Sequence, residues 1–240
     1  MNLDWSVGWQ YRHLLLDGVT VTVLLTVLTM AIAIPGGLLI MLMRQSRLAP
    51  VRGLGMAFVE FFRNLPLILL VYWSFYVLPL IMDAAMGWLN AGFARIGLGP
   101  FNPNLTLSPF ATGLVALSLN VSAYNSETFR AGVNSIRRGQ VDAALALGMS
   151  RLQVMRKVVL PQAVRRVLPV LASTWVSLFK DTSLVSVIGI GDLMHAATQA
   201  RSQSFRVLEV LTIMAAIYWL LGYPQAKIVD WIDRRFGVKE

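Results

Sequence analysis

Long stretches without charged side chains constrain the fold of this chain more than any other feature. Residues 18–43, 64–82, 105–126 and 210–226 carry no charge, and residues 167–191 are interrupted only by Lys180 and Asp181. Each stretch is near the roughly 20 residues that a helix needs to cross the hydrocarbon layer. We therefore predict an all-α membrane protein, a single domain of residues 1–240, with five transmembrane helices at about 18–43, 64–82, 107–127, 167–190 and 207–226.

Basic residues are distributed unevenly among the segments that connect these spans. Sixteen lie in the first and third connections and in the C-terminal tail, whereas four lie on the other side. The positive-inside rule then places the N-terminus outside and the C-terminus in the cytoplasm. The formal net charge of +9 does not indicate nucleic acid, because a nucleic-acid protein presents its basic residues on one face of a soluble domain.

Catalytic and metal-binding patterns are missing from the sequence. There is no cysteine, and His13 and His195 are far apart in the chain. Gly189-Ile190-Gly191 lacks the spacing and the lysine of a nucleotide-binding loop. We expect no catalytic residue, no metal site and no cofactor in this chain, so that a partner or an ion gradient must supply energy.

A polar segment, residues 132–162, separates the third and fourth predicted spans. Ala and Leu favour a helix around Asp142, Gly148 can adopt the left-handed conformation that ends a helix, and Ser150 with Gln153 can form a capping box. We expect Leu160-Pro161 to break the second helix. The segment is predicted to be a helix–turn–helix that docks a cytoplasmic partner.

Charged residues at the end of the third span allow two interpretations. Glu127 and Arg130 are three residues apart, so they share a helix face and can form an ion pair at the cytoplasmic rim. Alternatively, Tyr124 and Glu127 lie beside a translocation path, because charged side chains near membrane depth usually face a cavity or a partner.

The fourth span contains a second polar group, Lys180-Asp181-Thr182-Ser183. Adjacent residues of a helix point about 100° apart, so Lys180 and Asp181 do not simply neutralise one another. We expect the helix to be interrupted here, or each charge to find a partner on another helix or subunit. This favours a group that lines a substrate route over a purely structural break.

The polar segment resembles the EAA loop of permease subunits from bacterial ATP-binding-cassette (ABC) importers. The match is Asp142-Ala143-Ala144-x3-Gly148-x9-Val158-x-Leu160-Pro161, with Asp in place of Glu and Val in place of Ile. Residues 61–67, 124–132 and 180–184 are similar to the polar amino-acid uptake branch, most of all to glutamate/aspartate permeases. The resemblance extends from about residue 15 to residue 236.

This resemblance implies a type I importer fold, a multi-pass position in the bacterial inner membrane, and a mechanism driven by a partner. The permease is then not an enzyme, since a separate ATPase dimer binds ATP and Mg²⁺ and its closure turns the spans from inward-facing to outward-facing. A periplasmic or lipid-anchored solute-binding protein delivers the amino acid. The residues implied to contact the ATPase are Asp142, Ala143, Ala144, Gly148, Leu160 and Pro161.

In such importers five helices form half of a translocation path, so the resemblance implies a second permease subunit, identical or paralogous. An anionic substrate needs cations or donors along the path, and Glu127 would suit its amino group. The path candidates are Tyr124, Asn125, Glu127, Arg130, Lys180, Asp181, Thr182 and Ser183. The partner subunit is an alternative location for the main site.

Two sets of alternatives stay open. Within the ABC class, the cargo could be glutamine, a basic amino acid or methionine in place of glutamate or aspartate. Outside that class, a small ion-coupled carrier would work without an ATPase, but it would leave the arginine-rich segment 132–162 unexplained.

Overall fold

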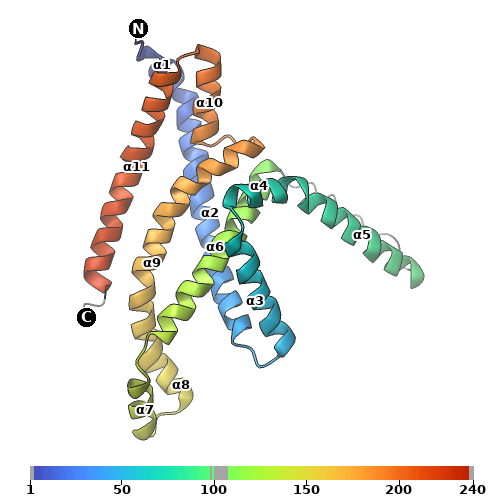
Figure 1. Cartoon of the computed structure of the whole chain (residues 1–240), viewed down its shortest axis with the longest axis vertical. Coiled ribbons are helices and arrows are strands. Elements are labelled where there is room, and N and C mark those ends of the chain that lie inside the picture. The colour runs from blue at the N-terminus through green and yellow to red at the C-terminus, as the bar shows by residue number, and fades with distance from the viewer. Residues whose placement is uncertain (1–2, 98, 100–107, 238–240) are drawn as a thin grey trace.

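The computed structural model describes residues 3–97, 99 and 108–237, and its regular structure in these residues is entirely helical. The α-helices are α1 Ser6–Gln10, α2 Arg12–Arg44, α3 Ala49–Asn64, α4 Leu67–Tyr76, α5 Leu78–Arg95, α6 Pro109–Asn134, α7 Arg138–Ala146, α8 Arg151–Val154, α9 Leu160–Asp181, α10 Leu193–Ser204 and α11 Val207–Phe236. Helices α2, α9 and α11 run roughly along the long axis of the molecule, with α7 and α8 at one end and α1 and α10 at the other (Figure 1).

Helices α2 and α6 pack against each other through small residues. A Cβ atom built on Gly37 of α2 would lie only 2.6 Å from the Cβ of Asn125 and 3.0 Å from the backbone N of Ser126, both on α6. Without a side chain at residue 37 the two backbones can approach closely, as at other membrane helix contacts. Pro35 precedes this contact, yet α2 continues as one helix from Arg12 to Arg44.

Replacing Gly37 by leucine is expected to destabilise the bundle, because the added side chain must push α6 away. Overpacking of this kind costs about 1–3 kcal/mol. The melting temperature of the purified protein in detergent measures the effect. Gly53→Leu on α3 is the matched control, since a Cβ there meets nothing within 4 Å, and equal melting temperatures for the two variants would contradict the close contact.

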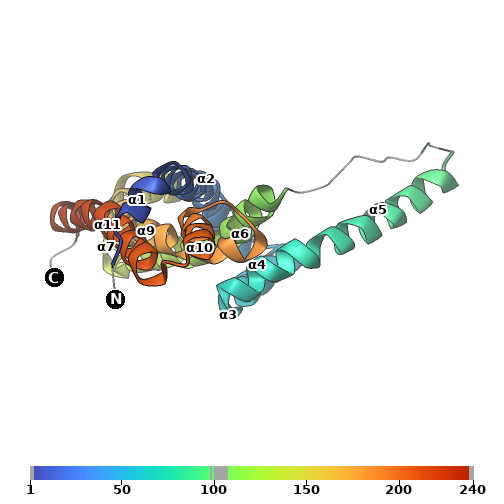
Figure 2. The same cartoon turned by 90° about the horizontal axis from the view of Figure 1, so that it is seen from above.

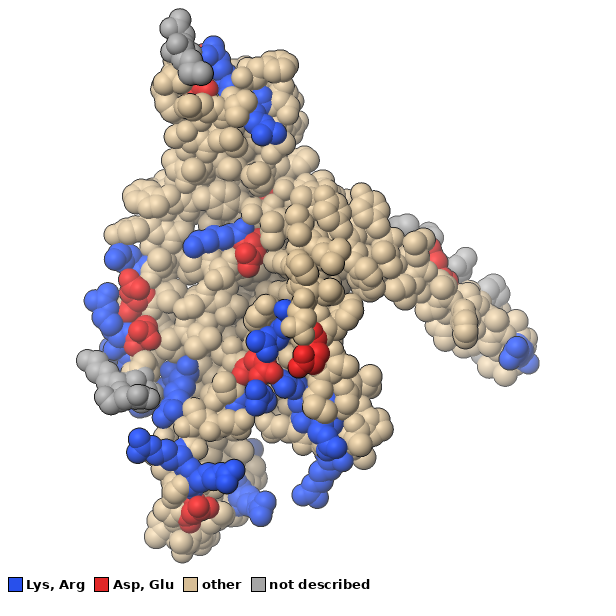
Figure 3. Space-filling view, viewed as in Figure 1, with Lys and Arg blue, Asp and Glu red and all other residues tan. Residues whose placement is uncertain are grey.

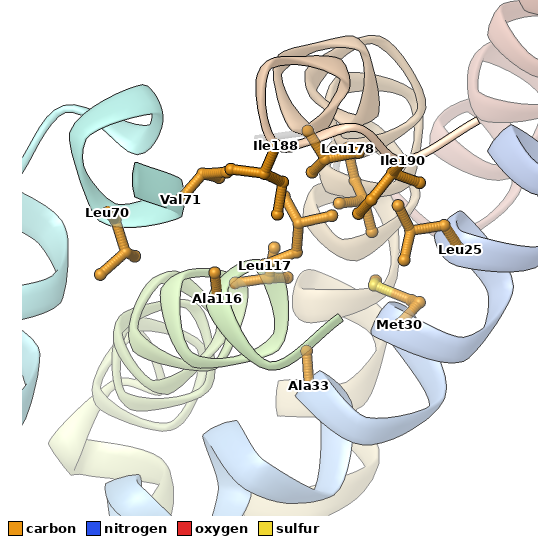
Figure 4. Packing of buried hydrophobic residues seen from close by; sticks show 12 residues of the cluster. Leu25, Met30, Ala33, Leu70, Val71, Ala116, Leu117, Leu178, Ile188 and Ile190 are labelled. Carbon is orange, nitrogen blue, oxygen red and sulfur yellow. The ribbon is translucent and has the colours of Figure 1, made fainter. Parts of the chain in front are cut away.

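The main hydrophobic core lies where α2, α4, α6 and α9 meet. Leu25, Leu70, Leu117 and Leu178, one from each helix, have at most 1% of their surface exposed. Figure 4 shows side chains from these elements pointing toward one another. A smaller cluster around Leu193 joins the start of α2 to α10 and α11.

The second predicted span is bent in the structure. Helices α3 and α4 meet at an angle of 110° on either side of Leu65 and Pro66, and Pro66 precedes α4 as its N-cap. Helix α5 then extends away from the bundle (Figures 1 and 2) and contains no buried residue. Residues 64–82 therefore cover the bend, α4 and the beginning of α5 rather than one straight helix.

Among the described residues, α2 and α11 are long and apolar enough to cross a membrane, and the bent pair α3–α4 gives a third candidate. The predicted span 107–127 falls on α6, although residue 107 lies outside the described residues. The predicted span 167–190 covers most of α9 and the 3-10 helix Thr182–Ile188. Five spans, with these boundaries, stay a prediction.

Candidate functional site

The polar segment between α6 and α9 folds into a small helical unit, residues 136–159, which we call the α7–α8 tip. Its two short helices close around a core of their own, formed by Ile136, Ala144, Val154 and Val159. The tip lies at the end of the molecule opposite to the N-terminus (Figure 1). A unit with its own core can keep its shape while it contacts another protein.

The turn of the tip has the predicted local structure. Gly148 has a φ of +79°, in the left-handed region that favours glycine. The backbone N–H of Gln153 donates to the Ser150 hydroxyl at 3.3 Å, and the Ser150 N–H donates to the Gln153 side chain at 2.8 Å. The predicted capping box at the start of α8 is therefore confirmed.

The predicted break at Leu160-Pro161 was wrong. Helix α8 continues through a π-helical segment, Met155–Val159, directly into α9. Pro161 lies in the first turn of α9, where its missing N–H costs little. The wider π turn, in which the Leu160 N–H donates to the carbonyl of Met155, lets the chain pass the proline without leaving the helical conformation.

The residues expected to contact an ATPase are not all on the surface of the tip. Asp142, Ala143 and Gly148 are exposed, and Leu160 and Pro161 are exposed at the start of α9. Ala144 is only 6% exposed and belongs to the core of the tip. Leu147, which the sequence analysis missed, is 84% exposed in the turn. The sequence feature that could have indicated this residue is a large apolar side chain next to Gly148 in a polar segment.

Glu127 of α6 is the centre of an ion cluster. Its Oε1 accepts from Arg44 Nη1 at 2.7 Å and lies 3.7 Å from Arg63 Nη1, and its Oε2 accepts from Arg130 Nη2 at 2.6 Å. The predicted ion pair with Arg130 is confirmed. Arg44 ends α2 and Arg63 lies in the last turn of α3, so the cluster joins three helices.

Replacing Glu127 by glutamine is expected to lower the melting temperature of the protein. The change leaves Arg44, Arg63 and Arg130 close together without the carboxylate between them, and loss of one partner from a partly buried ion cluster costs about 1–3 kcal/mol. Glu60→Gln is the control, because exposed Glu60 on α3 accepts a hydrogen bond from Asn64. A Glu127→Gln variant that melts with the control would show that the cluster adds no stability.

A cavity of about 400 Å³ lies between α6 and α9 beside the bend before α4, and we call it the Asp181 cavity. It combines one carboxylate with uncharged polar groups on two helices. Its polar lining residues are Asn120, Tyr124, Ser173, Thr174, Ser177 and Asp181. The Nδ2 of Asn120 also donates to the carbonyl of Phe62 at 2.9 Å, which fixes the amide at the wall.

Lys180 lines a different cavity from its neighbour Asp181. This second cavity, about 590 Å³, lies between α9 and α11, and Ser183, Tyr218 and Trp219 are among its lining residues. Helix α9 changes to the 3-10 helix directly after Asp181, which is the interruption that the polar group predicted. The two charges therefore face separate cavities and do not form an ion pair.

The remaining path candidates are dispersed. Asn125 and Thr182 are fully buried, where Asn125 donates to the carbonyl of Ala33 and Thr182 to that of Phe179. Glu127 and Arg130 line a third cavity. The candidates that line cavities therefore fall into three separate pairs, which are Tyr124 with Asp181, Lys180 with Ser183, and Glu127 with Arg130.

Comparison with known proteins places this fold in a family. Residues 33–238 match the family described as binding-protein-dependent transport system inner membrane component. The chain belongs to this family. It is 34% identical over 234 residues to the glutamate/aspartate import permease protein GltK of Escherichia coli O6:H1, with 97% of each chain covered. It is 31% identical over 238 residues to the glutamine transport system permease protein GlnP of Escherichia coli K12, with 99% of this chain and 100% of GlnP covered.

The fold of this permease is also known from a solved structure. A crystal structure described as an amino acid ABC transporter with histidines matches it with a TM-score of 0.82 at 30% identity, over 98% of this chain and 100% of the other. The resemblance to amino-acid ABC permeases and the type I importer fold are therefore confirmed.

Proposed function

We propose that this chain is the membrane-spanning subunit of an ATP-driven importer that carries glutamate or aspartate across the bacterial inner membrane by alternating access. The observation that carries the proposal is the α7–α8 tip. A polar unit with its own core, at one end of an apolar helix bundle, is suited to bind a soluble partner protein outside the membrane. An ATPase dimer that binds ATP and Mg²⁺ would dock there. The permease itself hydrolyses nothing.

The charge distribution supports a cytoplasmic position for the tip. Lys and Arg side chains gather around the tip and the nearby ends of the helices on the face shown in Figure 3, and fewer lie at the N-terminal end. By the positive-inside rule the N-terminus lies outside and the C-terminus inside. Five spans in this orientation form half of the path, and a second permease subunit supplies the other half. An external solute-binding protein delivers the cargo.

The Asp181 cavity is the proposed position of the cargo in this chain. Asp181 suits the amino group of an amino acid, and the second N–H of the Asn120 amide and the hydroxyl of Ser177 suit its carboxylate. Glu127 does not suit the amino group, because Arg44 and Arg130 already donate to its carboxylate.

Two cargo classes have support from particular observations. Glutamate and aspartate are favoured by the similarity to GltK over nearly the whole chain. They are also favoured by the positive charge of Arg63, whose guanidinium carbon lies 5.3 Å from the ring centre of Tyr124, a residue at the wall of the Asp181 cavity. Glutamine is the second candidate, because the cavity is lined by one carboxylate and no Lys or Arg among the described residues, and GlnP is similarly close.

Competition for uptake tests the cargo. Proteoliposomes that contain the permease subunits and the ATPase, with the binding protein outside and ATP inside, take up labelled glutamate in the presence of each unlabelled amino acid in excess. We expect aspartate and glutamate to compete and arginine and methionine to have no effect. Competition by glutamine with little effect of aspartate would replace glutamate with glutamine as the cargo.

A further inference from the structure

A third cavity, of about 630 Å³, adjoins the Asp181 cavity and has a different chemical character. Val170 of α9 lines both cavities. The polar side chains of the third cavity come from the end of α3, from α6 and its C-cap residue, and from α9. They are Arg63, Glu127, Thr128, Arg130, Ser135 and Arg166.

This arginine cavity has an excess of positive charge. Three guanidinium groups line it with one carboxylate, that of Glu127. Both oxygens of Glu127 are already engaged, Oε1 by Arg44 and Oε2 by Arg130, while Arg63 is no closer than 3.7 Å. The side chains of Arg63 and Arg130 are 41% and 43% exposed, so part of each guanidinium group is free to bind a further anion.

Arg166 gives an independent indication of a missing partner. Its Nη1 donates to the carbonyl of Ser135 at 3.0 Å, which holds the side chain against α6. Its Nε is buried and has no hydrogen-bond partner among the described residues. A buried donor without an acceptor costs about 1–3 kcal/mol, so a small rotation of the guanidinium group toward an acceptor in the cavity would relieve this cost.

We propose that the arginine cavity binds an oxyanion, a carboxylate or phosphate group, held by Arg63, Arg130 and Arg166. Guanidinium groups present parallel N–H donors that match the geometry of both oxyanions, and such charge-assisted bonds are among the strongest hydrogen bonds in proteins. Two sources share this chemistry. One is a soluble anion that reaches the cavity from water, and the other is the headgroup of an anionic phospholipid, which binds basic pockets between membrane helices.

The rate of arginine modification by phenylglyoxal, followed at each residue by mass spectrometry, tests the proposal without a mutation. The assembled transporter is placed in phosphatidylcholine nanodiscs with or without L-glutamate or inorganic phosphate, and in phosphatidylglycerol nanodiscs without either. We expect at least one anion source to slow modification of Arg63, Arg130 and Arg166 several-fold. Protection by the soluble anions identifies a soluble ligand, and protection in phosphatidylglycerol alone identifies a lipid headgroup.

Arg165 is the internal control, because it is exposed on the same helix and does not line the cavity. Its modification should not change with the anions, and in an Arg166→Gln variant the protection of Arg63 and Arg130 should weaken. The proposal is overturned if no anion source changes the modification rate of the three arginines. Rates that are fast under all conditions would mean that the cavity is empty, and rates that are slow under all conditions would mean that a partner subunit covers it. Such a result says nothing about whether the wild-type protein transports an amino acid, so this proposal can fail while the proposed function stands.

Discussion

Replacing Leu147 by aspartate is expected to abolish ATP-driven uptake while the permease stays folded and inserted. Leu147 is 84% exposed in the turn of the α7–α8 tip, so its loss should change the free energy of unfolding by less than about 0.5 kcal/mol. A central apolar anchor of an interface contributes about 2 kcal/mol or more, which is at least about thirtyfold in affinity. Uptake into proteoliposomes and co-purification of the ATPase measure the effect.

Leu48→Asp is the matched control for this change. Leu48 is 67% exposed in the connection before α3, outside the tip, and aspartate is a favourable residue at this N-cap position. The control should retain both uptake and the ATPase. If Leu147→Asp also retained both, the turn of the tip would not be the surface that binds the ATPase.

Replacing Asp181 by asparagine is expected to reduce uptake about 10–100-fold, because a charge-assisted hydrogen bond to the cargo contributes about 1.5–3 kcal/mol. Asparagine has nearly the same shape, so the 400 Å³ cavity keeps its volume. ATPase binding should be unchanged, since Asp181 lies in the bundle and not in the tip. Initial uptake rates over a range of cargo concentrations measure the loss.

Asp83→Asn provides the comparison for Asp181→Asn. Asp83 is exposed on α5, the helix without buried residues, and should tolerate the same loss of charge. Lys180→Gln addresses the neighbouring residue, which lines the cavity between α9 and α11. Uptake that fell with Lys180→Gln and not with Asp181→Asn would move the cargo to that second cavity.

Features set by a few neighbouring residues were predictable from the sequence. The left-handed turn at Gly148 and the capping box of Ser150 and Gln153 depend on residues within one turn of each other. The ion pair between Glu127 and Arg130 depends on a spacing of three along one helix. In each of these cases the local chemistry allows few alternatives.

Features set by packing between distant segments could not be read from the sequence. Arg44 reaches Glu127 from a position 83 residues earlier in the chain, and Asn125 is buried because Gly37 allows α2 to approach it closely. Lys180 and Asp181 face different cavities because α11 covers one side of α9 and α6 the other. The π-helical segment before Pro161 has no sequence signal that distinguishes it from a break.

Dependence of uptake on the ATPase tests the central claim most directly. Proteoliposomes are prepared with the permease subunits alone or together with the ATPase, with binding protein and labelled amino acid outside and ATP and Mg²⁺ inside. We predict uptake only when the ATPase is present, and none when Leu147→Asp replaces the wild-type chain. Uptake that continues without the ATPase, driven by an ion gradient, would contradict a permease that is powered through the α7–α8 tip.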